Sequence, residues 1–250
     1  MSESGWSEFL SDPAPLPAYR FDSALSADDN FLIWAAILCR HSSSRKGHMA
    51  ALLVRPSDNT VLAYANNTPL LFNAIQKKAP EVHAEALCIA RCARTGVNAM
   101  GATCYVTAPP CNECFMSLAS AGVKRIVHVN TTRTESVRIA AHVLGIEIVG
   151  VPHGPAGGRI DFNAQTRDFW TSAGETAGAT RTRVDSWWAK WMRAYKASAQ
   201  VLRIAVQDVP NDGSKKRRLI ADAAEDESMG KGVTDKVEEK DPSKEAGDET

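Results

Sequence analysis

Residues 101–128 read GATCYVTAPPCNECFMSLASAGVKRIVH, and this stretch decides the fold class of the 250-residue chain. Its apolar part at 102–107 predicts a strand, residues 111–121 predict a helix, and 125–129 predict a second strand. Pro110 suits the opening of that helix. A strand, a helix and a strand in succession indicate a partly parallel sheet with helices on its faces.

The alternation of strand and helix signals continues on both sides of this stretch. Strands are expected at 49–54 and 61–65, and the Pro-Ser-Asp-Asn turn between them indicates a β-hairpin. The helix expected over 135–144 is long enough for a parallel crossover to a strand at 146–151. Two further helices are expected at 28–40 and at about 83–94. Together these elements predict one α/β domain over residues 21–160.

Composition separates this domain from the rest of the chain. Residues 211–250 are rich in charge and lack aromatic side chains. They are expected to form a disordered tail, because they cannot bury enough apolar surface to offset the entropy of ordering. Residues 1–20 are expected to be an irregular arm, and 161–210 a loop followed by a helical extension. Within that extension, TSAGETAGAT (171–180) reads as a flexible loop.

Charge and hydropathy exclude several classes of protein. The 29 basic and 29 acidic residues give no net charge, which excludes a strongly basic nucleic-acid-binding protein. The longest apolar run, 31–39, is far shorter than the roughly 20 residues of a transmembrane helix, so no membrane partner is expected. The acidic, proline-containing N-terminus does not look like a secretory signal, which predicts a cytoplasmic protein. The basic run Lys215–Arg218 is either a nuclear localisation signal or a solvated charged segment.

His83, Cys111 and Cys114 form a candidate metal site. One imidazole and two thiolates supply three of the four ligands of a tetrahedral Zn²⁺ ion and leave one position open, as in catalytic zinc sites. Cys111 and Cys114 fall in the first turn of the expected helix, where the helix dipole favours the thiolate over the thiol.

Glu85 follows His83 by two residues and is the candidate catalytic acid and base. A carboxylate beside the metal can take a proton from an attacking water and return it to the ring nitrogen and the departing ammonia. Ala84 is small and allows the backbone and the substrate to approach closely. The alternative is a structural zinc site that staples two helices to the sheet, with Glu85 a solvated helix residue.

Residues 28–151 resemble the cytidine/deoxycytidylate deaminase superfamily, and deoxycytidylate deaminases most of all. The H-x-E…P-C-x-x-C pattern is the mark of zinc deaminases, and it is present here as His83-Ala84-Glu85 and Pro110 to Cys114. The stretch quoted above, FLIWAAILCRHSSSRKGHMAALLV (31–54) and YANNTP (64–69) are also similar to the family.

The resemblance implies a three-layer α/β/α sandwich around a five-stranded mixed sheet, a zinc cofactor, hydrolytic deamination and a homo-oligomer. It also implies that Asn66 contacts the substrate sugar. Asn67 stands where the family loop usually carries glycine.

Three functions are compatible with these residues. The first is an enzyme of nucleotide metabolism that deaminates a small cytosine-type nucleoside or nucleotide. The second is a deaminase that edits adenosine or cytidine in tRNA or another RNA. The third is an inactive, zinc-stapled partner subunit.

The second function would use the segment 181–203 to capture RNA, because aromatic residues alternate there with basic ones. A helix that buries its aromatic stripe is the favoured alternative for this segment. The aromatic residues are Trp187, Trp188, Trp191 and Tyr195, and the basic ones include Lys190, Arg193 and Lys196.

Cys88 and Cys92 lie four residues apart on the helix that carries His83. A second metal site is conceivable there, but small core residues are favoured, because free cysteines are usually buried.

Overall fold

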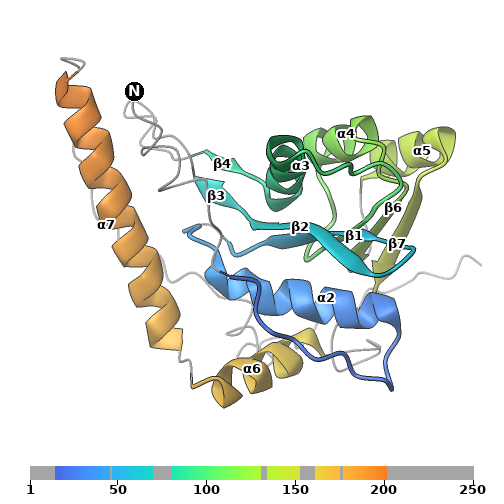
Figure 1. The fold of residues 1–250 in the computed structure, drawn as a ribbon, viewed down its shortest axis with the longest axis horizontal. Coiled ribbons are helices and arrows are strands. Elements are labelled where there is room, and N and C mark those ends of the chain that lie inside the picture. The colour runs from blue at the N-terminus through green and yellow to red at the C-terminus, as the bar shows by residue number, and fades with distance from the viewer. Residues whose placement is uncertain are drawn as a thin grey trace, which may run out of the picture.

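A five-stranded mixed sheet lies between two layers of helices in the computed structural model, which describes residues 15–45, 47–69, 80–130, 134–152, 161–174 and 177–201 (Figure 1). The strand order is β2-β1-β5-β6-β7, and a separate two-stranded sheet pairs β3 with β4. The strands are β1 Ala50–Arg55, β2 Thr60–Asn66, β3 Thr68–Pro69, β4 Glu81–Val82, β5 Thr103–Val106, β6 Arg125–Val129 and β7 Glu147–Val151. The helices are α2 Ala27–Leu38, the 3₁₀ turn η2 Cys39–His41, α3 Ala84–Thr95, α4 Asn112–Ser120, α5 Glu135–Leu144, α6 Phe162–Ser172 and α7 Ala177–Val201.

The strand directions agree with the prediction of a mixed sheet. Strand β1 pairs antiparallel with both β2 and β5, whereas β5, β6 and β7 run parallel. Helix α4 connects β5 to β6 and helix α5 connects β6 to β7. The α/β/α sandwich around a five-stranded mixed sheet is therefore confirmed, and each predicted strand and helix of this domain ends within a few residues of its expected limits.

Strand β1 divides the core into two halves because alternate side chains point to opposite faces of a sheet. Leu52 and Val54 face α2 and are fully buried there together with Phe31. Leu53 faces the opposite side and packs with Cys88 of α3. Figure 1 shows α2 and α6 on the first face and α3, α4 and α5 on the second.

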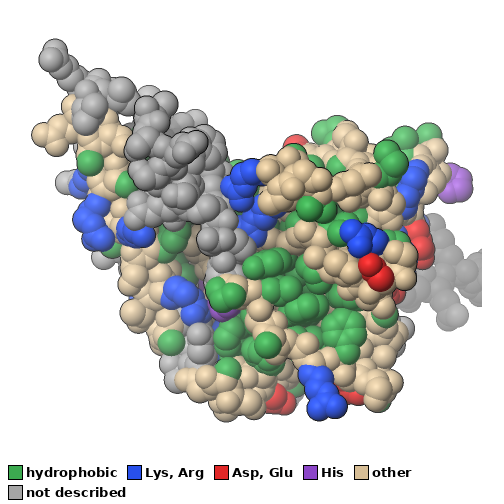
Figure 2. Space-filling view, viewed as in Figure 1, with side chains coloured by type: hydrophobic (Ala, Val, Ile, Leu, Met, Phe, Trp, Pro, Cys, Tyr) green, Lys and Arg blue, Asp and Glu red, His purple; other side chains and the backbone are tan. Residues whose placement is uncertain are grey.

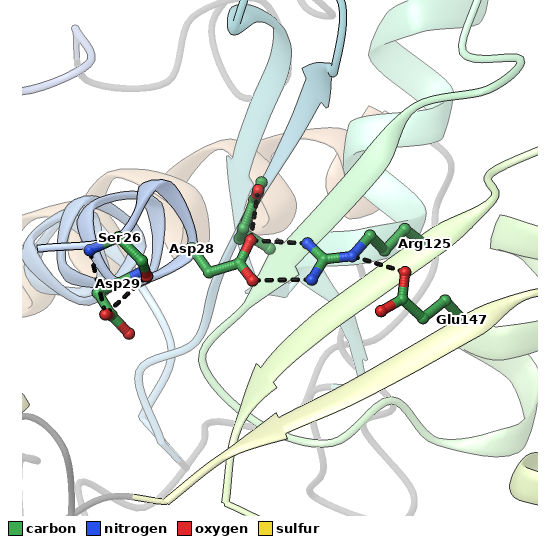
Figure 3. A network of polar contacts seen from close by, with 6 residues as sticks. Ser26, Asp28, Asp29, Arg125 and Glu147 are labelled. Carbon is green, nitrogen blue, oxygen red and sulfur yellow. Dashed lines mark hydrogen bonds and ion pairs between the residues drawn. The ribbon is translucent and has the colours of Figure 1, made fainter.

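Helix α2 is attached to the sheet by a polar network at its N-terminal end (Figure 3). Ser26 caps the helix through a reciprocal pair of hydrogen bonds with Asp29. Asp28 accepts two hydrogen bonds from the Arg125 guanidinium, at 2.6 Å and 2.8 Å, and a third from the Tyr105 hydroxyl at 2.9 Å. Arg125 is the first residue of β6, so this network lies near the N-terminal end of that strand. Helices α4 and α5 follow the opposite, C-terminal ends of β5 and β6.

The prediction of a loop over 171–180 is wrong. Helix α6 continues to Ser172 and helix α7 begins at Ala177, so both ends of this stretch are helical. Gly174, at φ +75°, lies just beyond the end of α6. The serine, threonine and glycine composition favoured a loop, but helices in proteins are stabilised mainly by packing, and α7 buries Val184, Trp188 and Trp191.

The outer segments are described only in part. Residues 15–20 have no regular structure but contact the domain, since Trp34 donates a hydrogen bond to the Pro17 carbonyl. The rest of the predicted arm, the tail over 211–250 and the Lys215–Arg218 run lie outside the described residues. No helix within the described ranges is both long and apolar enough to span a membrane.

Candidate active site

The three predicted metal ligands lie together at the N-terminal ends of α3 and α4. His83 is the N-cap residue of α3, and Cys111 is the N-cap residue of α4. Cys114 lies in the first turn of α4. Neither N-cap side chain bonds to the backbone of its own helix, unlike the usual capping residue. Cys111 thus precedes the helix rather than lying in its first turn, and both side chains are directed to each other.

The distances fit a tetrahedral zinc ion. His83 Nδ1 lies 3.5 Å from Cys111 Sγ and 3.4 Å from Cys114 Sγ, and all three ligand atoms lie within 4.8 Å of one another. Zinc–nitrogen and zinc–sulfur bonds of about 2.0 and 2.3 Å at a tetrahedral angle predict a separation of about 3.5 Å. Among the described residues this is the only such group, so Cys88 and Cys92 form no second metal cluster there.

The thiol of Cys114 departs from the expectation that a helix N-terminus favours the thiolate. Burial raises the pKa of Cys114, and the neighbouring Glu85 carboxylate and Cys111 raise it further. These effects outweigh the partial positive charge of the helix end. A bound divalent cation reverses this balance, because it stabilises the anion directly. The site is therefore suited to a metal rather than to a free, reactive thiolate.

Glu85 is a buried carboxylate in the first turn of α3. Its side chain is only 5% exposed, and burial raises the pKa of Glu85 above its usual value. Contact with Cys114 and the charge of His83 partly counteract this rise. A raised pKa makes a carboxylate a better proton acceptor than an exposed glutamate, which suits a residue that carries protons in catalysis. Glu85 is not the solvated helix residue that the structural-staple alternative requires.

The two predicted substrate-binding residues, Asn66 and Ala84, are both buried, and Ala84 lies between His83 and Glu85 in the chain. Asn66 ends β2, is 7% exposed, and donates from Nδ2 to the carbonyls of Leu38 and Met49. The Asn66 amide nitrogen is thus bonded to two backbone carbonyls. Ala84 is fully buried at the first position of α3. Its backbone N–H is one of those that a helix start leaves without an intrahelical partner.

A polar cluster adjoining the metal ligands was missed at the sequence level. The side chain of Asn67 makes four hydrogen bonds, two of them to Ser42 and Glu81. Glu81 lies two residues before His83. The signal that could have found the cluster is the asparagine at a position where the family loop usually carries glycine.

The aromatic side chains of α7 are used in packing. Trp188 and Trp191 are 8% and 7% exposed, and the Trp191 ring stacks against Trp187 and Tyr195. The predicted segment is helical, and two of its four aromatic side chains, Trp188 and Trp191, are buried, in a cluster with Val184. Figure 2 shows Lys and Arg side chains along the surface of α7.

Comparison with known proteins supports the site. Residues 26–130 match the family model described as the cytidine and deoxycytidylate deaminase zinc-binding region. A segment of 51 residues is 43% identical to the deoxycytidylate deaminases of enterobacteria phages T2 and T4. That segment covers 20% of this chain and only about a quarter of those relatives, 27% and 26% respectively.

Two solved structures are also similar. The deoxycytidylate deaminase of cyanophage S-TIM5, crystallised with dCMP and dUMP, is 21% identical, with a TM-score of 0.44 over 52% of this chain and 99% of its own. The guanine deaminase of Nitrosomonas europaea is 16% identical, with a TM-score of 0.42 over 62% of this chain and 88% of its own. The resemblance to the cytidine/deoxycytidylate deaminase superfamily is confirmed over residues 26–130 by the family model and the phage relatives.

Proposed function

We propose that this chain, whose residues 26–130 carry the cytidine and deoxycytidylate deaminase zinc-binding region, is a zinc-dependent hydrolytic deaminase. Its substrate is a small cytosine-type nucleoside or nucleotide. The observation that carries the proposal is the cluster of His83, Cys111 and Cys114 with the buried carboxylate of Glu85 beside it. Three protein ligands leave one coordination position open, which is the arrangement of catalytic rather than structural zinc sites.

The residues of the chain divide the chemistry between binding a metal and moving protons. When bound by His83, Cys111 and Cys114, zinc supplies a Lewis acid that lowers the pKa of water to about 7. The Glu85 carboxylate takes a proton from the attacking water. It delivers this proton to the pyrimidine N3 as the water oxygen bonds to C4. It then carries the remaining proton of the C4 hydroxyl to the exocyclic nitrogen, the C4–N bond breaks, and ammonia departs while C4 becomes a carbonyl.

The surroundings of Glu85 favour this proton traffic. Because burial raises its pKa, the carboxyl group accepts a proton more readily than an exposed glutamate would. The N-terminal end of α3 places the backbone N–H of Ala84 beside Glu85, where it can donate to the carbonyl oxygen of the base. The Oδ1 atom of Asn66 accepts a hydrogen bond from a sugar hydroxyl. Water, base and proton carrier are thereby held at one helix end.

The phage relatives support a cytosine nucleotide as the substrate, because a 51-residue segment is shared with deoxycytidylate deaminases. An RNA substrate has less support, since Trp188 and Trp191 are buried in packing and not available for stacking on bases. Self-association, which the superfamily resemblance implies, stays a prediction.

Ammonia release by the purified, zinc-loaded chain tests the proposal. The substrate panel contains cytidine, deoxycytidine, their monophosphates, the corresponding adenine and guanine compounds, and bulk tRNA. We expect turnover of a free cytosine compound, and a loss of about 10²- to 10⁴-fold in Glu85→Gln. Glu135→Gln is the matched control, because Glu135 is exposed and occupies the first turn of α5.

Each other outcome contradicts part of the proposal. Turnover of tRNA alone would replace the small-molecule substrate with RNA. Turnover that is equal in Glu85→Gln and Glu135→Gln would remove Glu85 from the mechanism. A zinc-loaded chain that deaminates no compound of the panel would refute the deaminase assignment.

A further inference from the structure

Helix α7 lies outside the family match but touches the loop at 42–45, which precedes β1. Trp188 of α7 donates a hydrogen bond from Nε1 to the Ser43 carbonyl at 2.9 Å. The Arg45 guanidinium lies 4.9 Å from the centroid of the Trp188 ring and forms an ion pair with Asp185 at 3.2 Å. Two residues of α7, one turn apart, thus hold the loop at Ser43 and Arg45.

The same loop contributes two buried hydroxyl groups to a network on its inner side. Ser42 is 1% exposed and donates to Asn67 Oδ1 at 2.7 Å. Ser44 is fully buried and donates to Glu81 Oε1 at 2.7 Å. Ser43, the residue that Trp188 holds, lies directly between these two serines. A shift of Ser43 therefore moves both hydroxyl groups.

Asn67 and Glu81 complete the network. Asn67 donates from Nδ2 to Glu81 Oε2 at 2.8 Å and to the Gly47 carbonyl at 2.8 Å. Its Oδ1 accepts from Ser42 and from the Met49 backbone at 2.9 Å. Every hydrogen-bonding position of this amide is filled, and each carboxylate oxygen of Glu81 accepts one bond. Ser42, Ser44 and Asn67 are buried and Glu81 is half-buried, and a network whose hydrogen bonds are satisfied in this way favours one arrangement of its members.

Glu81 connects the network to the metal ligand. It belongs to β4, a two-residue strand whose pairing in the sheet is with β3 alone. A pair of strands this short has little stability of its own. The backbone stays extended through His83, at φ −70° and ψ 155°, so the ligand continues the line of β4. The position of His83 therefore depends on the bonds that hold the Glu81 carboxylate.

We infer that α7 is a positioning element of the active site, which acts through Trp188, the loop at 42–45 and Glu81 to hold His83 in its metal-binding position. The inference rests on the proposed zinc site and assigns to the C-terminal helix a role that the deaminase region alone does not supply. Outer interactions that orient a metal-bound histidine change metal affinity by about 10- to 100-fold when they are removed.

Zinc affinity of the full chain, measured by competition with a chromogenic chelator, tests the inference independently of turnover. We expect Trp188→Ala and Glu81→Ala each to weaken zinc binding by about 10- to 100-fold. The double variant should have about the same zinc affinity as the single variant with the lower affinity. Both substitutions break the same chain of contacts from α7 to His83, so their effects should not add. The visible absorption of the cobalt-substituted protein should shift in the same variants, since it reports the ligand geometry around the metal.

Two conservative variants and one control separate positioning from stability. Glu81→Gln should retain most of the affinity, because its amide can accept from Asn67 and donate to Ser44. Trp188→Phe removes the bond to Ser43 and keeps a smaller aromatic ring beside Arg45, so it should have an intermediate effect. Trp34→Ala is the control, because Trp34 packs against the α2 side of the core and donates to the Pro17 carbonyl at 2.7 Å, and neither contact involves a member of the network. It should lower the melting temperature without changing zinc affinity.

The outcomes distinguish this inference from the proposed function. Suppose that the wild-type chain binds zinc and deaminates, and that Trp188→Ala and Glu81→Ala keep the wild-type zinc affinity and cobalt absorption. The positioning role of α7 is then overturned, while the proposed deaminase function stands. The same holds if Trp34→Ala weakens zinc binding as much as Trp188→Ala does. A wild-type chain that binds no zinc would overturn both proposals.

Discussion

The ion pair between Asp28 and Arg125 should be a measurable contributor to the stability of the domain (Figure 3). It joins the first turn of α2 to the start of β6 through two hydrogen bonds of 2.6 Å and 2.8 Å. The Arg125 side chain is only 27% exposed and the Asp28 side chain only 22%. Asp28 raises the pKa of Arg125 by this hydrogen-bonded contact, which indicates a favourable interaction between the two charges. The perturbation is Asp28→Asn, Arg125→Gln and the double variant.

The burial of the pair sets the expected magnitude. Exposed ion pairs contribute about 0–1 kcal/mol, whereas breaking a fully buried pair costs about 3–5 kcal/mol. With roughly a quarter of each side chain exposed and a bidentate geometry, we expect a coupling free energy of about 2 kcal/mol. Asp28 also lies in the favourable first turn of α2, but this dipole effect cancels in the cycle because it does not depend on Arg125.

Urea unfolding of the four proteins measures the coupling, and the pair Arg55–Asp58 provides the control. That pair forms one hydrogen bond of 3.0 Å, and its side chains are 50% and 47% exposed. Its coupling should be below about 0.5 kcal/mol. The reasoning is refuted if the coupling of Asp28 and Arg125 is no larger than that of the control pair.

Three further predictions concern titration, metal binding and substrate binding. His128 is fully buried and burial lowers its pKa, so the unfolded chain binds a proton below about pH 6.5 that the folded protein rejects. The free energy of unfolding should therefore be highest above that pH and should fall toward pH 5. In urea unfolding of zinc-free protein, His128→Gln should reduce this decrease. An equal dependence of the free energy of unfolding on pH in both proteins would contradict the argument. Cys114→Ala should reduce zinc content after dialysis from about one ion per chain to near zero, whereas Cys92→Ala, in the buried core, should retain it; equal zinc contents would exclude Cys114 as a ligand. Asn66→Ala should lower kcat/KM about 10- to 100-fold through loss of one hydrogen bond to the substrate. It should also reduce stability, because the Leu38 and Met49 carbonyls each lose a hydrogen bond from the Asn66 amide. Unchanged steady-state kinetics would show that Asn66 is structural only.

Local sequence patterns were sufficient for the strands and helices of the central domain. The apolar runs of β1 and β5 are buried on both faces, so their composition alone indicates strands. Residues 135–144, predicted as a helix from their pattern, form α5 with these limits. The residue types and spacing of His83, Glu85, Cys111 and Cys114 likewise predicted one metal centre from the sequence alone.

Other features depended on contacts between distant segments. The composition of 171–180 favoured a loop, but the burial of Trp188 and Trp191 stabilises α7 and extends the helix into that stretch. The dipole of α4 favoured a thiolate at Cys114, yet burial and the Glu85 carboxylate raise the pKa of this thiol. In each case a tertiary effect exceeded a local preference.

The sequence by itself determined the strand and helix pattern and the set of metal-binding residue types, because periodicity and ligand spacing are local properties. Only the tertiary structure decided that Asn67, Glu81 and Ser44 form one hydrogen-bonded network, and that Trp188 bonds to Ser43 in the loop that carries Ser44. These groups come from four separate segments of the chain. The residue pattern within one segment does not predict which distant group its buried polar side chains will bond to. The physical reason is that a buried polar group must find a partner, and the fold of the whole chain chooses that partner.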